Sequence, residues 1–512
     1  MKTPRPLPLL AAWLAASLAG CSFIPTYERP AAPVAAQWPQ ESRPPAAAEN
    51  AAADLPWQQF VVEPELRQTI ELALAGNRDL RAAMANIEQT RAQYQIARAN
   101  LFPVVGLDVN QSRSAPNAYQ ALGLGGSVSS NAMWTVGISS WEIDLFGRIR
   151  ALKDVALAQY LATEEARKSM QMSLIASVAG AWLQLKTDTE LLALAQRTLA
   201  TREQSLQLTQ LRFDNGAASR LDLHDAQSLA ATARAAQAQQ QRLRAQDINA
   251  LALLAGVPAE RLPLPPVPPV TLPQAPLDNT QMADAPAPTA PLPAFADVPA
   301  GLPSDLLLRR PDIRAAEQQL IAANANIGAA RAAFFPRLSL TAGLGRVSGA
   351  LDDLLTNNPT SRAWSFAPNL SLPIFDFGRN TGNLEAAKAA REAAVAQYEK
   401  AIQTAFREVA DALAGRATYA DQLAALQAQA QAERERYRLS DLSYRNGAAS
   451  YLNLLDAQRA LFAVEQSVAQ VRLAQRVNEV ALYKALGGGW SGADEQAAGQ
   501  AAPVSQAPSA QP

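Results

Sequence analysis

The sequence predicts a mostly α-helical fold with two tandem structural repeats and a few transmembrane β-strands. The segment 211–227, LRFDNGAASRLDLHDAQ, returns at 442–458 as LSYRNGAASYLNLLDAQ, and eleven of the seventeen positions are identical. Alanine is abundant, which favours long helices. Apolar residues recur at alternating steps of three and four from Val395 to Tyr444, the spacing of a left-handed coiled coil. At about 1.5 Å per residue, a helix of roughly 64 residues spans about 96 Å, more than a compact globule needs.

Composition excludes several classes of function. The 512 residues carry a formal net charge of −1, so no basic excess is present to bind nucleic acid. One Cys and one His exclude a disulfide framework and a Cys/His metal site. The single histidine, His224, matches Leu455 in the second copy, which indicates packing or solvent contact. No nucleophile motif, phosphate loop or metal spacing is present, so we expect neither an enzyme nor a cofactor.

The N-terminus is typical of an exported lipoprotein. Lys2 and Arg5 precede a short apolar run, and the small residues up to Gly20 form a cleavage site, so residues 1–20 are predicted to be a signal peptide. The sequence Leu-Ala-Gly-Cys resembles a bacterial lipobox, which implies that Cys21 becomes the acylated N-terminus of the mature chain. Residues 21–63 would then form a lipid-anchored segment, and Ser22 favours delivery to the outer membrane.

The repeats are expected at 64–256 and 304–489, joined by a linker at 257–303 and followed by a flexible tail at 490–512. Residues 258–303 hold fourteen of the 35 prolines, a composition that neither a helix nor a central strand tolerates. Each repeat has the same predicted order: a helix, two strands, a very long helix and a second long helix. The ranges are 64–101, 104–113, 134–143, 151–214 and 220–256, then 304–334, 338–347, 364–372, 380–446 and 451–487.

The turn between the two long helices has the same sequence, Asn-Gly-Ala-Ala-Ser, in both repeats. Asn-Gly supplies a left-handed helix end, and the serine can cap the next helix. Small side chains let another backbone approach closely. We therefore expect the two tips to contact a partner protein through Asn215, Gly216, Ala217, Ala218 and Ser219, and through Asn446, Gly447, Ala448, Ala449 and Ser450.

The strands require more than one chain. Each is about ten residues long, the length of a tilted membrane strand, and aromatic residues such as Trp134 and Trp364 bracket them. Four strands cannot close a barrel, and an open edge in lipid leaves backbone groups unsatisfied. Two chains would give eight strands with a filled interior, and three would give twelve with room for a conduit. A transport role favours three.

Several motifs resemble hallmarks of the OprM-like outer-membrane efflux channels in the TolC family. They are GLPSDLLLRRPDIRAAE at 301–317, FGR at 377–379, AIQTAFREVADAL at 401–413, LLDAQR at 454–459 and LYKALGGGW at 482–490, together with the mature start from Cys21. The resemblance implies a homotrimer with a twelve-stranded β-barrel in the outer membrane and a periplasmic α-helical barrel. It also implies a multidrug efflux role with a periplasmic adaptor and an inner-membrane RND-type transporter as partners. The linker, which is longer and richer in proline than usual, would form part of an equatorial belt.

A closed gate is expected at the periplasmic tips. Leu452 and Asp456 lie four residues apart, on a helix face opposite the Leu454/Ala457 seam, which leaves the lumen or the outside. The resemblance places a leucine-and-aspartate constriction at these two positions and suggests that Tyr444 and Arg445 help to tether it. The first repeat offers Leu221 and Asp225 at the matching sites.

Two other readings stay open. A periplasmic adaptor lipoprotein can also carry a lipobox and a coiled-coil hairpin, although it would have one hairpin rather than two. The channel could also serve a different export system, for proteins or metals.

Overall fold

The computed structural model describes residues 22–35, 37–38, 55–115, 129–266, 292–298, 309–349 and 362–490. The signal peptide, Cys21, the tail after residue 490 and most of the linker lie outside the described residues. The chain divides into two compact units. The first comprises Met1–Ala32, Ala85–Glu165 and Ala315–Lys400; the second comprises Pro33–Met84, Ala166–Arg314 and Ala401–Pro512.

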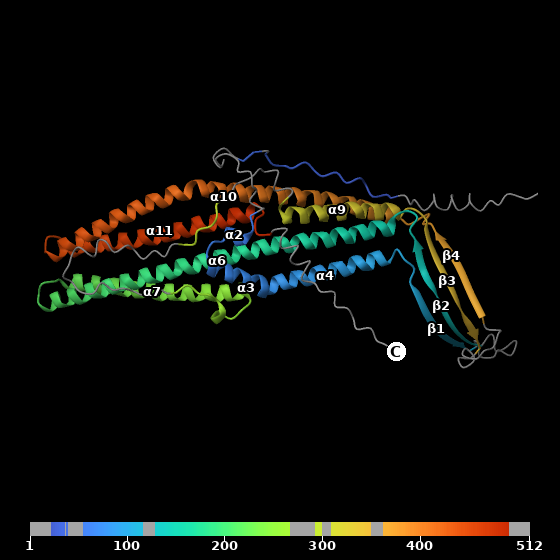
Figure 1. Cartoon of the computed structure of the whole chain (residues 1–512), viewed down its shortest axis with the longest axis horizontal. Helices are drawn as coiled ribbons and strands as arrows, with labels where there is room; N and C mark the ends of the chain where they lie inside the picture. The colour runs from blue at the N-terminus through green and yellow to red at the C-terminus, as the bar shows by residue number, and fades with distance from the viewer. Residues whose placement is uncertain are drawn as a thin grey trace, which may run out of the picture. The chain divides into compact units, whose positions relative to one another are not determined.

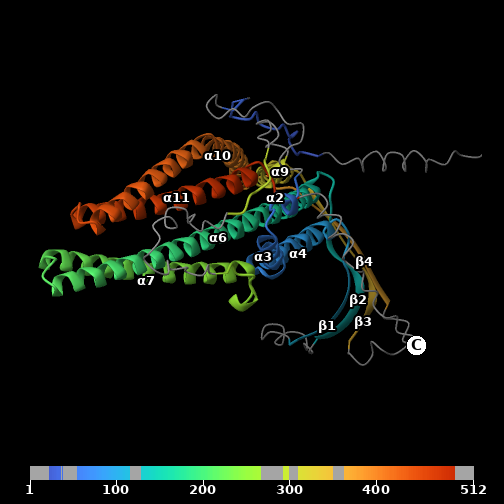
Figure 2. The same ribbon diagram turned by 60° about the vertical axis from the view of Figure 1, so that its left-hand side comes forward.

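The first unit contains an antiparallel sheet with the strand order β1-β2-β3-β4. Figure 1 shows the four strands side by side, and Figure 2 shows that the sheet is curved. The strands are β1 (Val105–Ser114), β2 (Ser129–Ile143), β3 (Arg337–Ser348) and β4 (Arg362–Ser371). β2 begins five residues before its predicted start because Ser129 pairs with Ser114. Its ladder to β3 shifts register between Ile138 and Trp141, next to Ser140, which has a φ of 50°.

The long helices begin where the chain leaves the sheet. Gly147 and Gly378 have φ values of 76° and 88°, which turn the chain into α6 (Arg148–Asp214) and α10 (Arg379–Arg445). The Asp144 carboxylate accepts a hydrogen bond from the Arg150 N–H at 2.9 Å, and the Asp376 carboxylate accepts one from the Asn380 N–H at 2.9 Å. Each aspartate thus satisfies a free donor in the first turn of a long helix.

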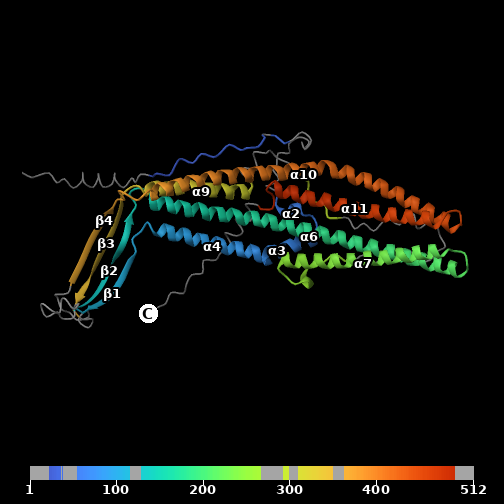
Figure 3. The same cartoon turned by 180° about the vertical axis from the view of Figure 1, so that it is seen from behind.

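The two long helices match in length. Each has 67 residues, so each spans about 100 Å, and their bounds differ by the 231 residues that separate the repeated motifs. Each is followed by an antiparallel partner, α7 (Arg220–Ala255) and α11 (Tyr451–Ala485). In Figures 1 and 3, α6 and α7 lie side by side, and so do α10 and α11.

The predicted coiled-coil seam of α10 is confirmed. From Val395 to Tyr444, every seam position except Arg416 is buried or half-buried. The Arg416 guanidinium instead lies 2.6 Å from the Asp297 carboxylate and donates a hydrogen bond to the Val298 carbonyl at 2.8 Å. The segment 292–298, which belongs to the proline-rich stretch, is therefore tied to α10 in the second unit.

The prediction of one helix over 64–101 is wrong, because the chain breaks at Asn77 between α3 (Pro64–Gly76) and α4 (Arg78–Ala99). The Asn77 carboxamide oxygen accepts from the Leu80 N–H at 2.9 Å, and its amide donates to the Leu254 carbonyl at 2.9 Å. This side chain begins one helix and joins it to the end of α7. A Cβ atom on Gly76 would lie 2.5 Å from the Ala255 carbonyl oxygen, so the two helix ends meet backbone to backbone.

The remaining elements are short or start late. The helix α9 (Pro311–Ala332) begins with a proline at its first position, seven residues after the predicted start; 304–308 lie outside the described residues. The second unit also holds α2 (Trp57–Phe60) and a 3₁₀ turn at Ala259–Arg261. Phe60 of α2 stacks on Tyr483 with ring centroids 3.9 Å apart.

Candidate functional site

The end of each long hairpin is a turn closed by a left-handed glycine. Gly216 and Gly447 have φ values of 74° and 70°. One residue further on, the N–H of Ala217 donates to the carbonyl five residues back at 2.7 Å, and the N–H of Ala448 does the same at 2.9 Å. This bond pattern ends a helix and satisfies one of its free carbonyls. The two tips therefore have the same backbone geometry.

The caps that start the next helices differ. The Ser219 hydroxyl accepts from the Asp222 N–H at 3.1 Å and donates to the Asp222 carboxylate at 2.7 Å, and that carboxylate accepts from the Ser219 N–H at 3.0 Å. The predicted serine cap is confirmed here, and Asp222 completes it as a capping box. Ser450 makes no side-chain cap bond, so that part of the prediction is wrong for the second tip. The position of Asp222 is taken by Asn453, whose neutral amide lacks the carboxylate that orients the serine hydroxyl.

The predicted tip residues are open to solvent. Ala218 and Ala449 are half-buried, and the other eight are exposed. Each tip thus presents a short stretch of backbone with small side chains, which a partner chain can approach closely.

The structure places Leu452 and Asp456 on the exposed face of α11. The Leu452 side chain is 59 % exposed, whereas Leu454 and Ala457 on the opposite face are buried. In the first repeat, Leu221 is 69 % exposed. A leucine this exposed at a helix end is a candidate for contact with another chain.

Asp225 differs from its counterpart Asp456. It is half-buried, and its charge contributes to raising the pKa of Tyr451, the first residue of α11. Burial is the main cause of that shift, which takes the Tyr451 pKa to about 12. The Tyr451 phenol therefore stays protonated at physiological pH. Asp456 is exposed, so the two aspartates do not have equivalent surroundings.

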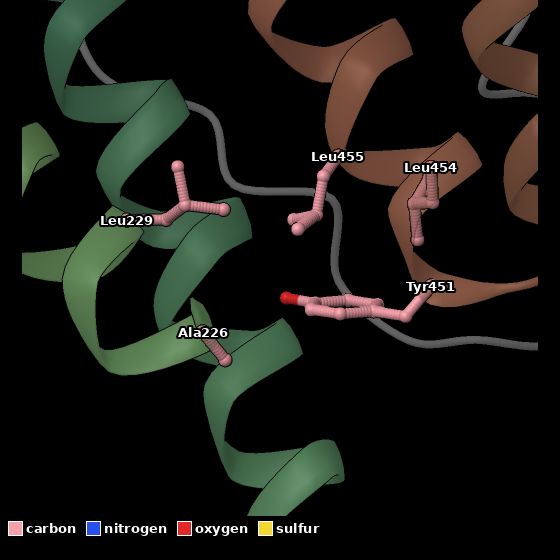
Figure 4. Close-up of a cluster of buried hydrophobic side chains, with 5 residues drawn as sticks. All are labelled: Ala226, Leu229, Tyr451, Leu454 and Leu455. Atoms are coloured by element: carbon pink, nitrogen blue, oxygen red, sulfur yellow. The ribbon is translucent and has the colours of Figure 1, made fainter. Parts of the chain in front are cut away.

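Tyr451 belongs to an apolar cluster that joins the two hairpins near their tips. Figure 4 shows its ring extending from α11 toward α6 and α7, beside Ala226, Leu229, Leu454 and Leu455. Sequence reasoning missed this residue, although an aromatic side chain directly after a helix cap was an available signal.

Tyr444, a predicted tether, is half-buried and packs against that cluster. Its ring centroid lies 5.3 Å from that of Tyr451, and the Arg212 guanidinium lies 4.9 Å from its ring. Tyr444 thus joins α10 to both α11 and the end of α6. The side chain of Arg445, the other predicted tether, lies outside the described part of the structure.

The motif around Arg310 has a structural role in the second unit. The Arg310 guanidinium bonds the Asp312 carboxylate at 2.6 Å, the Glu408 carboxylate at 2.8 Å and the Ala485 carbonyl at 2.9 Å. A buried guanidinium needs several acceptors, and here three elements supply them. One side chain thus fastens the start of α9 to α10 and to the end of α11.

In the described ranges, no three His, Cys, Asp or Glu side chains come together as a metal site. None of the described helices has the length and hydropathy of a membrane-spanning helix. The only histidine, His224, is exposed and lies 3.1 Å from the Gln227 carboxamide oxygen.

Comparison with known proteins decides the family. The model of the outer membrane efflux protein family matches residues 69–257 and 302–488. The chain belongs to the outer membrane efflux protein family. It is 45 % identical over 478 residues to the probable efflux pump outer membrane protein TtgC of Pseudomonas putida, covering 92 % of this chain and 93 % of that one.

Solved structures agree with this placement. A membrane protein from Pseudomonas aeruginosa superposes with a TM-score of 0.79 at 40 % identity, covering 91 % of this chain and all of that one. The open state of the MtrE outer membrane channel of Neisseria gonorrhoeae gives 0.77 at 38 % identity, covering 92 % and 98 %. This member of the family is an outer-membrane channel of an efflux pump. The family consists of channel proteins rather than enzymes. Membership in it supports the interpretation as a channel and not the alternative of a periplasmic adaptor.

Proposed function

We propose that three copies of this efflux channel share one twelve-stranded barrel in the outer membrane and extend their long hairpins into the periplasm as an α-helical tube. The observation that carries the proposal is the four-stranded sheet with two open edges. Among the described residues, β1 pairs only with β2, and β4 only with β3. In lipid these edges need partners, and a neighbouring copy supplies a β4 for each β1.

One face of the sheet suits lipid. The pairing register places Leu107, Val136, Leu344 and Trp364 in one row across the four strands. Leu107, Leu344 and Trp364 are each at least 65 % exposed. Large apolar side chains this exposed are unfavourable in water and favourable against acyl chains.

The other face suits a water-filled conduit. The row next to these apolar residues lies on the opposite face of the sheet and consists of Gly106, Gly137, Gly343 and Ser365. The next row on that face contains Asp108 and Thr135. Small and polar side chains on the inner face leave an open bore, which a twelve-stranded barrel has room for and an eight-stranded barrel does not.

The chain count is the test. The mass of the detergent-solubilised complex, measured by native mass spectrometry, should equal three chains. A complex of two chains would give eight strands and would overturn the proposed conduit, and a monomer would leave the sheet edges open.

The tips would form the resting gate. An export duct has to stay closed at rest, and the exposed Leu452 and Asp456 lie in the first two turns of α11. Three copies would bring these leucines and carboxylates near one ring, where apolar side chains close the bore and acids bind cations. Tyr444 and Arg445 would tether α10 beside them. Leu221 would add to the ring, whereas the half-buried Asp225 would contribute less.

The double variant Leu452→Ala with Asp456→Ala should raise single-channel conductance in planar bilayers and make cells sensitive to a large antibiotic that the wild type excludes. The matched control, Leu221→Ala with Asp225→Ala, should have the smaller effect. Wild-type conductance in the first variant would show that these residues are not the gate.

We propose that the tips bind a periplasmic adaptor, which connects the duct to an inner-membrane RND-type transporter. Tryptophan at the exposed Ala217 or Ala448 should block such close contact and abolish efflux while the complex stays folded. These alanines lack the positive φ of the neighbouring glycines, so the turn itself is unstrained. Tryptophan at the exposed Ala424, away from the tips, serves as the control. Normal drug resistance in both tip variants would refute tip docking.

Relatives are named for efflux of antibiotics, toluene and solvents. We propose the same class of cargo, drugs and apolar toxic compounds, conducted passively; susceptibility of a deletion strain tests it.

We also propose that Cys21 is acylated and anchors the mature chain in the outer membrane. Mass spectrometry of the mature N-terminus decides this, since an unmodified Cys21 would refute it.

A further inference from the structure

A cavity in the second unit lies between α6, α7 and α11, behind the tips. Its volume is 330 Å³, and it is lined by Arg202, Ser228, Thr232, Arg459 and Phe462 together with Leu229, Thr198 and three alanines. It is flanked by two apolar clusters that join the hairpins. One is the cluster of Figure 4; the other contains Leu191, Leu194, Ala469 and Phe462.

The cavity contains a buried guanidinium that no carboxylate of the described residues neutralises. Arg202 is only 6 % exposed. Its Nη1 donates to the Leu229 carbonyl at 3.2 Å, and its Nε has no hydrogen-bond partner. The Phe462 ring lies 5.9 Å away. Burying a charge this far without an acid is costly.

A second arginine shares the cavity. Burial and the like charge of Arg459 both lower the pKa of Arg202, and no carboxylate acts on it. Other arginines along the same helices have acids. Arg472 lies 3.2 Å from the Glu190 carboxylate, and the charges of Glu465 and Glu190 act on Arg197. The missing countercharge is therefore a local property of this cavity.

The donors in the cavity match an oxyanion. Guanidinium groups present parallel N–H donors to carboxylate and phosphate oxygens. The Thr198 and Thr232 hydroxyls already donate to the carbonyls of Leu194 and Ser228, so neither is free to donate to a ligand. Arg202, Arg459 and the Ser228 hydroxyl remain as donors.

We propose that this cavity binds a small oxyanion, a phosphate or a carboxylate, between Arg202 of α6 and Arg459 of α11. The bound anion supplies a countercharge that no described side chain gives either arginine, and it joins α11 to the first hairpin. The exposed Arg459 and Ser228 lie at the solvent side, which gives the ligand a way in.

The test uses the purified full-length channel in detergent. Isothermal titration calorimetry with sodium phosphate and with sodium glutarate, at an ionic strength held constant with sodium chloride, separates the two sources of the anion. We expect saturable binding of at least one, with a matching rise in Tm. Phosphate alone assigns a phosphate group as the ligand, and glutarate alone assigns a carboxylate.

The variant Arg459→Gln carries the assignment. Arg459 is exposed, so this variant should fold, and it should bind the anion at least about tenfold more weakly because one charged donor is lost. The control Arg234→Gln removes an exposed arginine from α7 that pairs with Glu203 at 2.7 Å, and it should bind like the wild type. Saturable binding of neither anion, or wild-type affinity in Arg459→Gln, would overturn the proposal.

Discussion

Glu317 holds the start of the described chain against the first unit. Its carboxylate accepts two hydrogen bonds from the Arg29 guanidinium at 2.7 and 2.9 Å, and one from the Tyr27 hydroxyl at 3.0 Å. Near the end of α9, a Cβ atom on Gly328 would lie 2.5 Å from the Ile24 side chain, so only glycine leaves room for it. The residues that follow the proposed acylation site are thus fixed on α9.

A pair of acids in the second unit, the buried Asp188 and the half-buried Asp247, should make stability depend on pH. Burial and a hydrogen bond to Asp188 raise the pKa of Asp247 from 3.8 to about 7. In the unfolded chain the same group releases its proton near pH 4. Between about pH 4 and 7 the folded state therefore binds more protons, so this stability is complete below pH 4 and lost as the pH rises through 7.

The variant Asp247→Asn should remove much of the stability loss that the wild type shows as the pH rises through 7. Its amide can still donate to the Asp188 carboxylate, but it cannot ionise. The wild type should show a Tm at pH 8 that is lower than at pH 5 by roughly a few degrees, since Asp247 is half-buried and water screens part of the effect. The variant should narrow this difference, whereas the exposed Asp421→Asn should not. An unchanged difference in Asp247→Asn would show that the pair is not responsible.

Among the helices, the two hairpins provide a matched comparison of helix capping. Ser219→Ala removes a capping box and should destabilise the first turn of α7 by about 1 kcal/mol, which is roughly a fivefold increase in local opening. Ser450→Ala removes no side-chain bond and should change the start of α11 far less. Hydrogen–deuterium exchange of peptides that cover the two tips measures both. Equal changes in the two variants would contradict this reading.

For the whole molecule, the proposed lipid face predicts that an added charge is more damaging on one face of the sheet than on the other. Leu344→Arg puts a charge on the apolar row of the sheet and should cost about 2–4 kcal/mol if that row lies near the bilayer midplane. Ser365→Arg, in the adjacent row on the opposite face, should be tolerated if that face lines the proposed bore. Folding into lipid vesicles, followed by heat-modified gel mobility across a urea series, measures both. If Ser365→Arg is the more damaging variant, the faces are reversed.

Much of the fold follows from local patterns. The motif repeated 231 residues apart predicts paired hairpins, and the 3.5-residue spacing predicts the buried side of α10, with Arg416 as the one exposed position. The helix break at Asn77 was missed because its cause is nonlocal: the Asn77 amide bonds the end of α7, which is distant in sequence.

Local sequence patterns specify the long hairpins, the strands and the tips of this protein, because periodicity, glycine and helix caps act over a few neighbouring residues. The pairings on which the candidate sites depend arise from tertiary packing. It brought Tyr451 against the first hairpin and left Arg202 without an acid beside Arg459. Such contacts depend on which faces of distant helices meet, and the energy of a buried charge is set by those neighbours rather than by its place along the chain.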